Sequence, residues 1–124
     1  MDYRAAPLRV FVYGTLLRGE SNHHFMSGAR LLGRLRSAPR YSLYSLGAYP
    51  VLCCHGSSRV SGEVYRISPD ILNRLDGLEG YPDDYDRMLL RTPWGPAWVY
   101  YHHQLPAAGR FIAAGSWRDY RRPG

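Results

Sequence analysis

Two periodicities of apolar residues run along this chain, and they predict several short strands and one main helix. Leu8–Tyr13 is short, β-branched and aromatic, which is typical of a largely buried strand, and Gly14 ends the run. Arg30–Arg36 and Tyr41–Leu46 alternate partly with a period of two, which predicts strands with one face in water. Further strands are expected at Val60–Ile67, Met88–Arg91 and Ala97–Tyr101, the last two forming a hairpin around the turn at Pro93–Pro96.

The clearest helix begins at Ser68-Pro69-Asp70, which supplies a capping side chain, a first-turn proline and an acidic residue. Its apolar positions recur every three or four residues and predict one stripe against the core: Ile71, Leu72, Leu75 and Leu78. Asn73, Arg74 and Asp76 are expected to face water, and Gly80 and Pro82 to end the helix. A shorter helical piece, His23–Met26, is predicted between a cap at Ser21-Asn22 and Gly28.

Gly47, Tyr49 and Pro50 are predicted to form a loop, and the segment after Tyr101 is loop-like up to Gly124. The count is therefore five to seven short strands with one clear helix and few crossovers. This pattern predicts an α+β domain with a small, mixed, barrel-like sheet and short flanking helices. A length of 124 residues is typical of a single domain, residues 1–124.

Composition excludes several classes of protein. No apolar run approaches the roughly 20 residues that a membrane-spanning helix needs, so we expect no membrane association. Met1–Ala6 lacks the features of a secretory signal, and we expect a cytoplasmic protein. The net charge of +6 comes from sixteen arginines with no lysine, which excludes a lysine Schiff base. The arginines are scattered, with only Arg118, Arg121 and Arg122 clustered, so no specific nucleic-acid binding is expected.

Neighbouring Cys53 and Cys54 would form a strained disulfide, so a reducing compartment is expected, with the inward-facing cysteine serving as a small core residue. A catalytic thiol is the less favoured reading. A metal site could be drawn from Cys53, Cys54, His55, His102 and His103, but adjacent ligands rarely surround one ion and the usual zinc spacing is absent. We therefore expect no metal.

The chain has three glutamates, and only Glu79 occupies a position that can turn its carboxylate into a general base. Glu20 follows a glycine in a polar loop and Glu63 lies within a predicted strand. Glu79 ends the predicted helix, where the negative end of the helix dipole disfavours ionisation. If it points into an apolar pocket, desolvation raises its pKa above about 4.3, which makes a carboxylate a useful general base. A helix-end glutamate is also often an ordinary solvated residue.

The turn Tyr13-Gly14-Thr15-Leu16 is the second candidate feature. Glycine lets the backbone approach a ligand closely, and consecutive N–H groups in such a turn can form a concave site for a carboxylate. A plain β-turn is the alternative reading.

Taken together, these segments resemble the γ-glutamyl cyclotransferase-like superfamily, especially its γ-glutamylamine cyclotransferase branch and its small bacterial relatives. The matching pieces span about residues 10 to 90 in order: Val12-Tyr13-Gly14-Thr15-Leu16 with Gly19 and Asn22, Tyr49-Pro50, Gly62-Glu63-Val64-Tyr65, Leu75-Asp76-Gly77-Leu78-Glu79-Gly80-Tyr81-Pro82, Tyr85 and Arg87. The segment from Leu105 to Gly124 carries little of the pattern. The family often has Gly-Asp-Trp there, where this chain has Gly115-Ser116-Trp117, which leaves the role of that aspartate in doubt.

The resemblance implies a small β-barrel with flanking helices and one cavity, in which a γ-glutamyl amine or γ-glutamyl amino acid closes to 5-oxoproline and a free amine. It implies that Glu79 is the general acid/base and that Tyr13, Gly14, Thr15 and Leu16 bind the substrate, with Tyr49 and Tyr85 as walls or hydroxyl donors. The chain shows neither a P-loop nor a Rossmann fingerprint, so no nucleotide or redox cofactor is expected. We expect a monomer or weak homodimer. The rival interpretation is a noncatalytic binding module with the same cavity.

Overall fold

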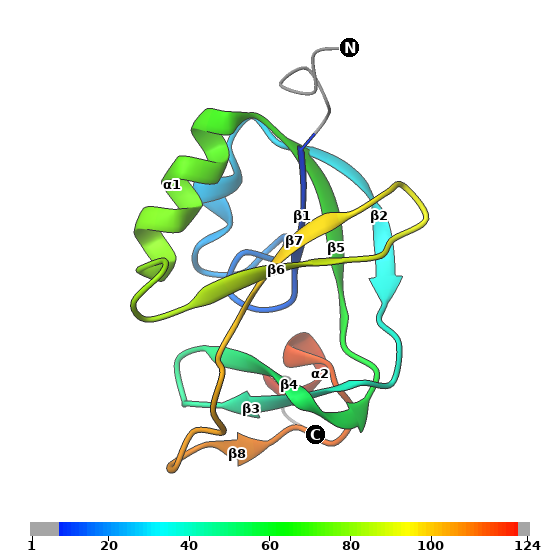
Figure 1. Ribbon diagram of the computed structural model, residues 1–124, viewed down its shortest axis with the longest axis vertical. Coiled ribbons are helices and arrows are strands. Elements are labelled where there is room, and N and C mark those ends of the chain that lie inside the picture. The colour runs from blue at the N-terminus through cyan, green and yellow to red at the C-terminus, as the bar shows by residue number, and fades with distance from the viewer. Residues whose placement is uncertain (1–7, 122–124) are drawn as a thin grey trace.

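A computed structural model of the chain describes residues 8–121, which form eight strands and three helices (Figure 1). In chain order they are β1 Leu8–Val12, the 3₁₀ helix η2 His23–Met26, β2 Arg30–Arg36, β3 Tyr41–Ser45, β4 Pro50–Ser58, β5 Ser61–Ile67, α1 Pro69–Glu79, β6 Asp86–Leu90, β7 Ala97–Tyr101, β8 Arg110–Phe111 and α2 Trp117–Arg121. The predictions for Met1–Ala6 and Arg122 lie outside the described residues.

Five strands form a mixed sheet in the order β2-β5-β1-β7-β6. The central strand β1 runs antiparallel to β5, from Leu8 opposite Ile67 to Val12 opposite Glu63, and parallel to β7. Three of its five residues are buried, because side chains on both faces of a central strand meet packed elements. The predicted β6–β7 hairpin is present, in antiparallel register from Asp86 opposite Tyr101 to Leu90 opposite Ala97.

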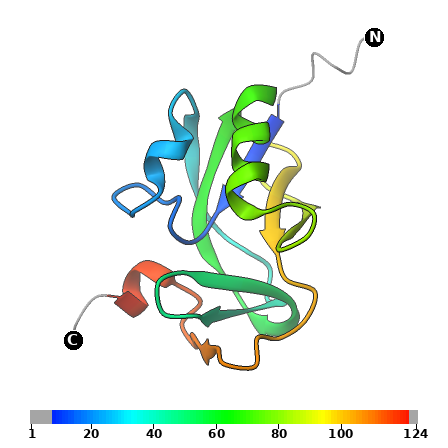
Figure 2. The same ribbon diagram turned by 90° about the vertical axis from the view of Figure 1, so that its left-hand side faces the viewer.

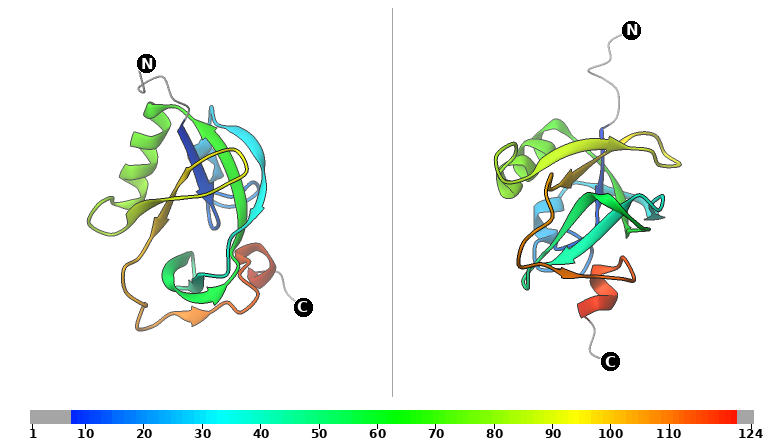
Figure 3. Two further views of the ribbon diagram at one scale, coloured as in Figure 1. Left: turned by 45° about the vertical axis from the view of Figure 1, so that its right-hand side comes forward. Right: turned by 60° about the horizontal axis from the view of Figure 1, so that its bottom comes forward.

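The other three strands form an antiparallel sheet in the order β4-β3-β8. This smaller sheet lies below the larger sheet in Figure 1, and α1 lies beside the larger sheet. The two views of Figure 3 place β8 and α2 at the end of the molecule that holds the smaller sheet. The end of β1 therefore points into the space between the two sheets and α1.

Helix α1 has the predicted caps. The Ser68 hydroxyl accepts from the Ile71 N–H (3.2 Å), a proline occupies the first turn, and Gly80 ends the helix with φ 68°. This left-handed conformation strains any residue with a side chain, and glycine adopts it without that cost. Ile71 and Leu75 are buried against the larger sheet, as the apolar stripe predicts.

Helix η2 differs from the prediction in its cap. Asn22 precedes it but makes no capping bond with its side chain, which instead donates to the Thr15 hydroxyl (3.0 Å). A single 3₁₀ turn results, and Asn22 stabilises the loop after β1.

Two apolar clusters fill the interior. One joins β1 to α1 and includes Val10, Val12, Ile71 and Leu75, and the other lies between the two sheets and includes Phe11, Leu43, Val64 and Trp117. Adjacent residues of β1 thus serve different clusters, because successive side chains of a strand point to opposite faces.

The α+β class and the mixed sheet are confirmed, but several details of the prediction are wrong. Residues 8–121 contain eight strands in two sheets, and β2 and β6 are the edge strands of the larger sheet, so that sheet is not a closed barrel. Pro50 begins β4 rather than belonging to a loop, because it pairs with Ser45 at the end of β3. The loop-like C-terminal segment contains β8 and α2, held by the buried residues Ile112 and Trp117.

Within residues 8–121, none of the helices has both the length and the apolar character required to span a bilayer.

Candidate active site

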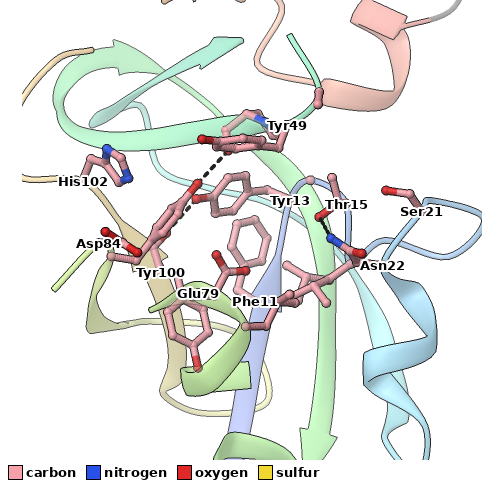
Figure 4. Close-up of a pocket in the computed structure, with 17 residues that line it drawn as sticks. Phe11, Tyr13, Thr15, Ser21, Asn22, Tyr49, Glu79, Asp84, Tyr100 and His102 are labelled. Carbon is pink, nitrogen blue, oxygen red and sulfur yellow. Dashed lines mark hydrogen bonds between the residues drawn. The ribbon is translucent and has the colours of Figure 1, made fainter. Parts of the chain in front are cut away.

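A cavity of about 560 Å³ opens where β1 ends, between the two sheets and the C-terminal end of α1. All seven residues predicted for the site line it: Tyr13, Gly14, Thr15, Leu16, Tyr49, Glu79 and Tyr85. Figure 4 shows Glu79 in the middle of the group, with Thr15, Ser21 and Asn22 on one side and Asp84 and His102 on the other. The structure therefore brings the turn and the carboxylate, 66 positions apart in the sequence, into one cavity.

Glu79 is the last residue of α1, and its side chain enters the cavity beside the aromatic rings that form the cavity wall (Figure 4). No side chain or backbone group of residues 8–121 makes a hydrogen bond or ion pair with its carboxylate. Burial raises the pKa of Glu79 from 4.5 to about 7, because the charged form loses solvent without gaining a partner. Near neutral pH this carboxyl group is therefore present in both protonation states.

The end of α1 is held in place by an ion pair one turn before Glu79. Asp76 accepts from Arg87 of β6 through both carboxylate oxygens (3.0 and 3.3 Å) and from the Tyr100 hydroxyl of β7 (2.7 Å). The Arg87 guanidinium also lies over the rings of Tyr81 and Trp98. The prediction that Asp76 faces water is wrong, because the β6–β7 hairpin lies against this helix face. These contacts fix the helix end that carries Glu79.

The loop after β1 lines the cavity on one side of Glu79 (Figure 4). The carbonyl groups of Gly14, Thr15 and Leu16 accept from the Leu17 N–H, the Asn22 N–H and His23 Nδ1, at 2.8 to 3.1 Å. The N–H groups of the same three residues have no hydrogen-bond partner among residues 8–121. Consecutive N–H groups without a partner in a turn are the kind of group that can bind a carboxylate or another anion. We call residues 13–16 the substrate loop, after the role that the resemblance implies for them.

Gly14 is required for the close approach of the substrate loop to β4. A Cβ atom at this position would lie 2.6 Å from Cγ of Pro50. The two motifs Tyr13–Leu16 and Tyr49-Pro50 are thus packed against each other, and the space between them leaves no room for a larger residue.

Most tyrosine hydroxyls around the cavity already form hydrogen bonds within the protein. Tyr13 donates to the Tyr100 carbonyl (2.8 Å) and accepts from the Leu52 N–H (3.2 Å), which joins the two sheets. Tyr85 donates to the Pro50 carbonyl (3.2 Å). Tyr49 is 44% exposed, and its hydroxyl has no partner among the described residues. Of these three hydroxyls, that of Tyr49 has both of its hydrogen-bonding roles open to a ligand.

Comparison with known proteins identifies the family of this chain. Residues 10–119 match the family described as gamma-glutamyl cyclotransferase, AIG2-like. The chain belongs to this family. The gamma-glutamylcyclotransferase family protein YtfP of Escherichia coli K12 is 44% identical over 113 residues, which cover 90% of this chain and 97% of that protein.

Solved structures show the same family fold. Protein PH0828 of Pyrococcus horikoshii superposes with a TM-score of 0.81 at 27% identity, covering 92% of each chain. An AIG2-like protein from mouse superposes with a TM-score of 0.72 at 27% identity, covering 82% of this chain and 80% of that one.

Several cavity residues of this family member were not predicted from the sequence, among them Phe11, Asp84 and His102. Phe11 and His102 come from β1 and the residue after β7, where only sheet pairing reveals which way a side chain points. Burial lowers the pKa of His102, and its Nε2 atom is buried without a partner among residues 8–121. Asp84 lies in the exposed turn after α1, close to His102 (Figure 4).

The departure from the family pattern at Gly115-Ser116-Trp117 has a structural meaning. The Ser116 hydroxyl accepts from the Asp119 N–H (3.2 Å), which is the bond of a helix N-cap at the start of α2. Serine and aspartate are both preferred caps. The substitution therefore keeps the local function of the position, and Trp117 remains buried at 1% exposure.

The two cysteines are free, with Cys53 buried as expected and Cys54 partly exposed beside Met88. Burial raises the pKa of both thiols, which disfavours the reactive thiolate. Among residues 8–121, no three or more His, Cys, Asp or Glu side chains are grouped so as to hold a metal ion.

Proposed function

We propose that the protein converts a γ-glutamyl amine or γ-glutamyl amino acid into 5-oxoproline and a free amine. The α-amino nitrogen of the substrate bonds to its own γ-carbonyl carbon, and the bond from that carbon to the leaving nitrogen breaks. Glu79 accepts a proton from the α-ammonium group and gives it to the leaving nitrogen. The second proton that the α-nitrogen loses as the new amide forms follows the same route, so the amine leaves as an ammonium ion. One amide replaces another, so the reaction requires neither an oxidant nor a nucleotide.

The observation that carries this proposal is the pKa of about 7 at a carboxyl group that shares its cavity with three unpartnered N–H groups. A general base works best when its pKa is near the working pH, because it is then both ionised and basic enough to take the proton. Such a proton shuttle contributes roughly 10² to 10⁴ in rate.

The substrate loop supports one orientation of the glutamyl group. Its α-carboxylate would accept from the N–H groups of Gly14, Thr15 and Leu16, which places the α-amino group toward Glu79. Any of these donors that the α-carboxylate leaves free would stabilise negative charge on the γ-oxygen as the tetrahedral intermediate forms. The leaving amine would then extend toward Asp84 and His102, on the far side of Glu79 (Figure 4).

This reaction requires no nucleophile from the protein. The attacking and attacked groups belong to one molecule, and holding them in reactive geometry supplies effective molarities of about 10⁵ M or more. The raised pKa values of the buried Tyr13, Tyr85 and Tyr100 hydroxyls favour their neutral forms, so Glu79 is the base that this wall provides.

The test is to incubate the protein with γ-glutamyl amines, γ-glutamyl amino acids and glutathione, and to measure 5-oxoproline by liquid chromatography. We expect release from at least one substrate and its loss in Glu79→Gln, which keeps the shape of the side chain. Asp83→Asn is the matched control, since Asp83 is exposed and does not line the cavity. No product from any substrate would contradict the proposal and favour the noncatalytic binding module. Full activity of Glu79→Gln would show that Glu79 is not the general acid/base.

A further inference from the structure

A buried carboxylate holds the substrate loop from behind. Glu63 of β5 is only 3% exposed, and its Oε1 accepts from the Arg18 N–H (3.0 Å) and the Tyr65 hydroxyl (3.0 Å). Arg18 follows the substrate loop by two residues. A carboxylate this deeply buried is stabilised only when its oxygens have hydrogen-bond partners, so the Arg18 N–H is a required contact rather than an incidental one.

The C-terminal helix completes this contact. Arg118 of α2 donates to the Arg18 carbonyl and lies 3.5 Å from Oε2 of Glu63. Both polar groups of the Arg18 backbone are therefore bonded, one by β5 and the other by α2. We call Glu63, Arg118 and the Arg18 backbone the Arg18 clamp. Figure 2 shows α2 directly below the loop that follows β1.

The clamp acts on the direction of the cavity donors. The Leu17 N–H donates to the Gly14 carbonyl, and the clamp holds the peptide group that joins Leu17 to Arg18. Because each peptide unit is planar, the Gly14 carbonyl and the Thr15 N–H lie in one plane, so a contact that fixes this carbonyl also fixes the direction of that N–H. The Thr15 donor thus depends, through Leu17, on contacts made outside the cavity.

We propose that Glu63 and Arg118 are positioning residues for substrate binding, through which the C-terminal helix sets the orientation of the substrate loop. This inference rests on the proposed function, since the bound group is the α-carboxylate of a γ-glutamyl substrate. Neither residue lines the active-site cavity, so both act through the Arg18 backbone.

The surroundings of the Arg18 clamp allow Arg118 to be replaced in a protein that still folds. A second cavity of about 550 Å³ lies on this side of the loop and is lined by Glu63 and Arg118 together with Leu17, Arg34, Arg36 and Ser116. A polar cavity of this size admits water. If Arg118 is shortened, water can therefore reach the Glu63 carboxylate, and the variant is expected to fold.

The kinetic test compares Arg118→Gln with Arg121→Gln. Arg121 lies on the same helix but pairs with Glu20, beyond the clamp. We expect Arg118→Gln to raise KM about tenfold, the effect of losing a hydrogen bond to a charged group, with kcat within about twofold and the midpoint of the pH profile unchanged. Glu63→Ala should raise KM further, and Glu63→Gln should recover part of the loss because its amide oxygen can still accept from the Arg18 N–H. Equal KM values for Arg118→Gln and Arg121→Gln would overturn the inference.

A second measurement does not depend on turnover. Amide hydrogen exchange followed by NMR should show the Arg18 N–H exchanging about tenfold faster in Arg118→Gln than in Arg121→Gln, because the clamp no longer closes over it. The Gly14, Thr15 and Leu16 amide resonances should shift in the first variant only. If the wild type releases no 5-oxoproline but these changes occur, the proposed function fails while the clamp stands. Unchanged exchange and unchanged resonances would refute the clamp in either case.

Discussion

Replacing Glu79 by glutamine should make the folded protein more stable above neutral pH. The cavity raises the pKa of this carboxyl from 4.5 to about 7, so the ionised form is disfavoured in the folded state. Each pKa unit corresponds to about 1.4 kcal/mol of differential interaction between the two protonation states. The full rise therefore represents up to about 3 kcal/mol of folding free energy.

The sign follows from proton binding. Between pH 4.5 and about 7 the folded state holds the Glu79 proton while the unfolded state has lost it, so the free energy of unfolding falls as the pH rises through this window. Glutamine is neutral in both states and removes this dependence. The two proteins should be equally stable well below pH 4.5, and the variant should gain its full advantage above pH 7.

Urea unfolding followed by tryptophan fluorescence at half-unit pH steps from 4 to 8 measures this difference. We expect the unfolding free energies of the wild type and Glu79→Gln to diverge steadily between pH 4.5 and 7 and to differ by a constant amount above pH 7. Curves that stay parallel across the whole range would refute the reasoning, because they would mean that Glu79 titrates alike in the folded and unfolded protein.

Three substitutions test the supports of the site. Gly14→Ala places a Cβ atom 2.6 Å from the Pro50 ring, so urea unfolding should show a free energy of unfolding lower by about 1–3 kcal/mol, and kinetics should show a higher KM. Unchanged values would mean that the loop shifts to accept the methyl group without loss of stability. Tyr13→Phe removes the hydroxyl that joins the two sheets and should lower the unfolding free energy by about 1–3 kcal/mol with little change in kcat. A fall in kcat at unchanged stability would instead place that hydroxyl on the substrate. Asp76→Asn breaks the ion pair with Arg87 and should cost about 1.5–3 kcal/mol in the same unfolding assay, with no loss expected only if the pair is dispensable.

The features that the sequence predicts correctly are those determined by residues close together in the chain. The caps of α1 depend on Ser68, Pro69 and Gly80, and all three act within one turn of the helix they bound. The turn after β1 likewise follows from one buried strand meeting a glycine. Such local signals require no knowledge of the rest of the fold.

Features that depend on partners distant in sequence are missed or misjudged. Asp76 has the pattern of a solvent-facing helix residue, and only the β6–β7 hairpin supplies the arginine and tyrosine that bind it. Strand β4 begins at Pro50 because β3 pairs with it, and α2 is too short to show a helical period. Glu63 looks like an ordinary strand residue until the loop at Arg18 is seen to lie over it.

The protonation state of Glu79 near neutral pH decides whether this carboxyl group can act as the base. The chain has only three glutamates, so the side-chain carboxyl ¹³C resonances of a ¹³C-glutamate-labelled sample are few, and the signal missing from Glu79→Gln identifies the residue. We expect this resonance to titrate with a midpoint of about 7 in the wild type. A midpoint near 4.5 would rule out Glu79 as the base, because it would describe a carboxylate fully exposed to water and unsuited to accept the substrate proton at neutral pH.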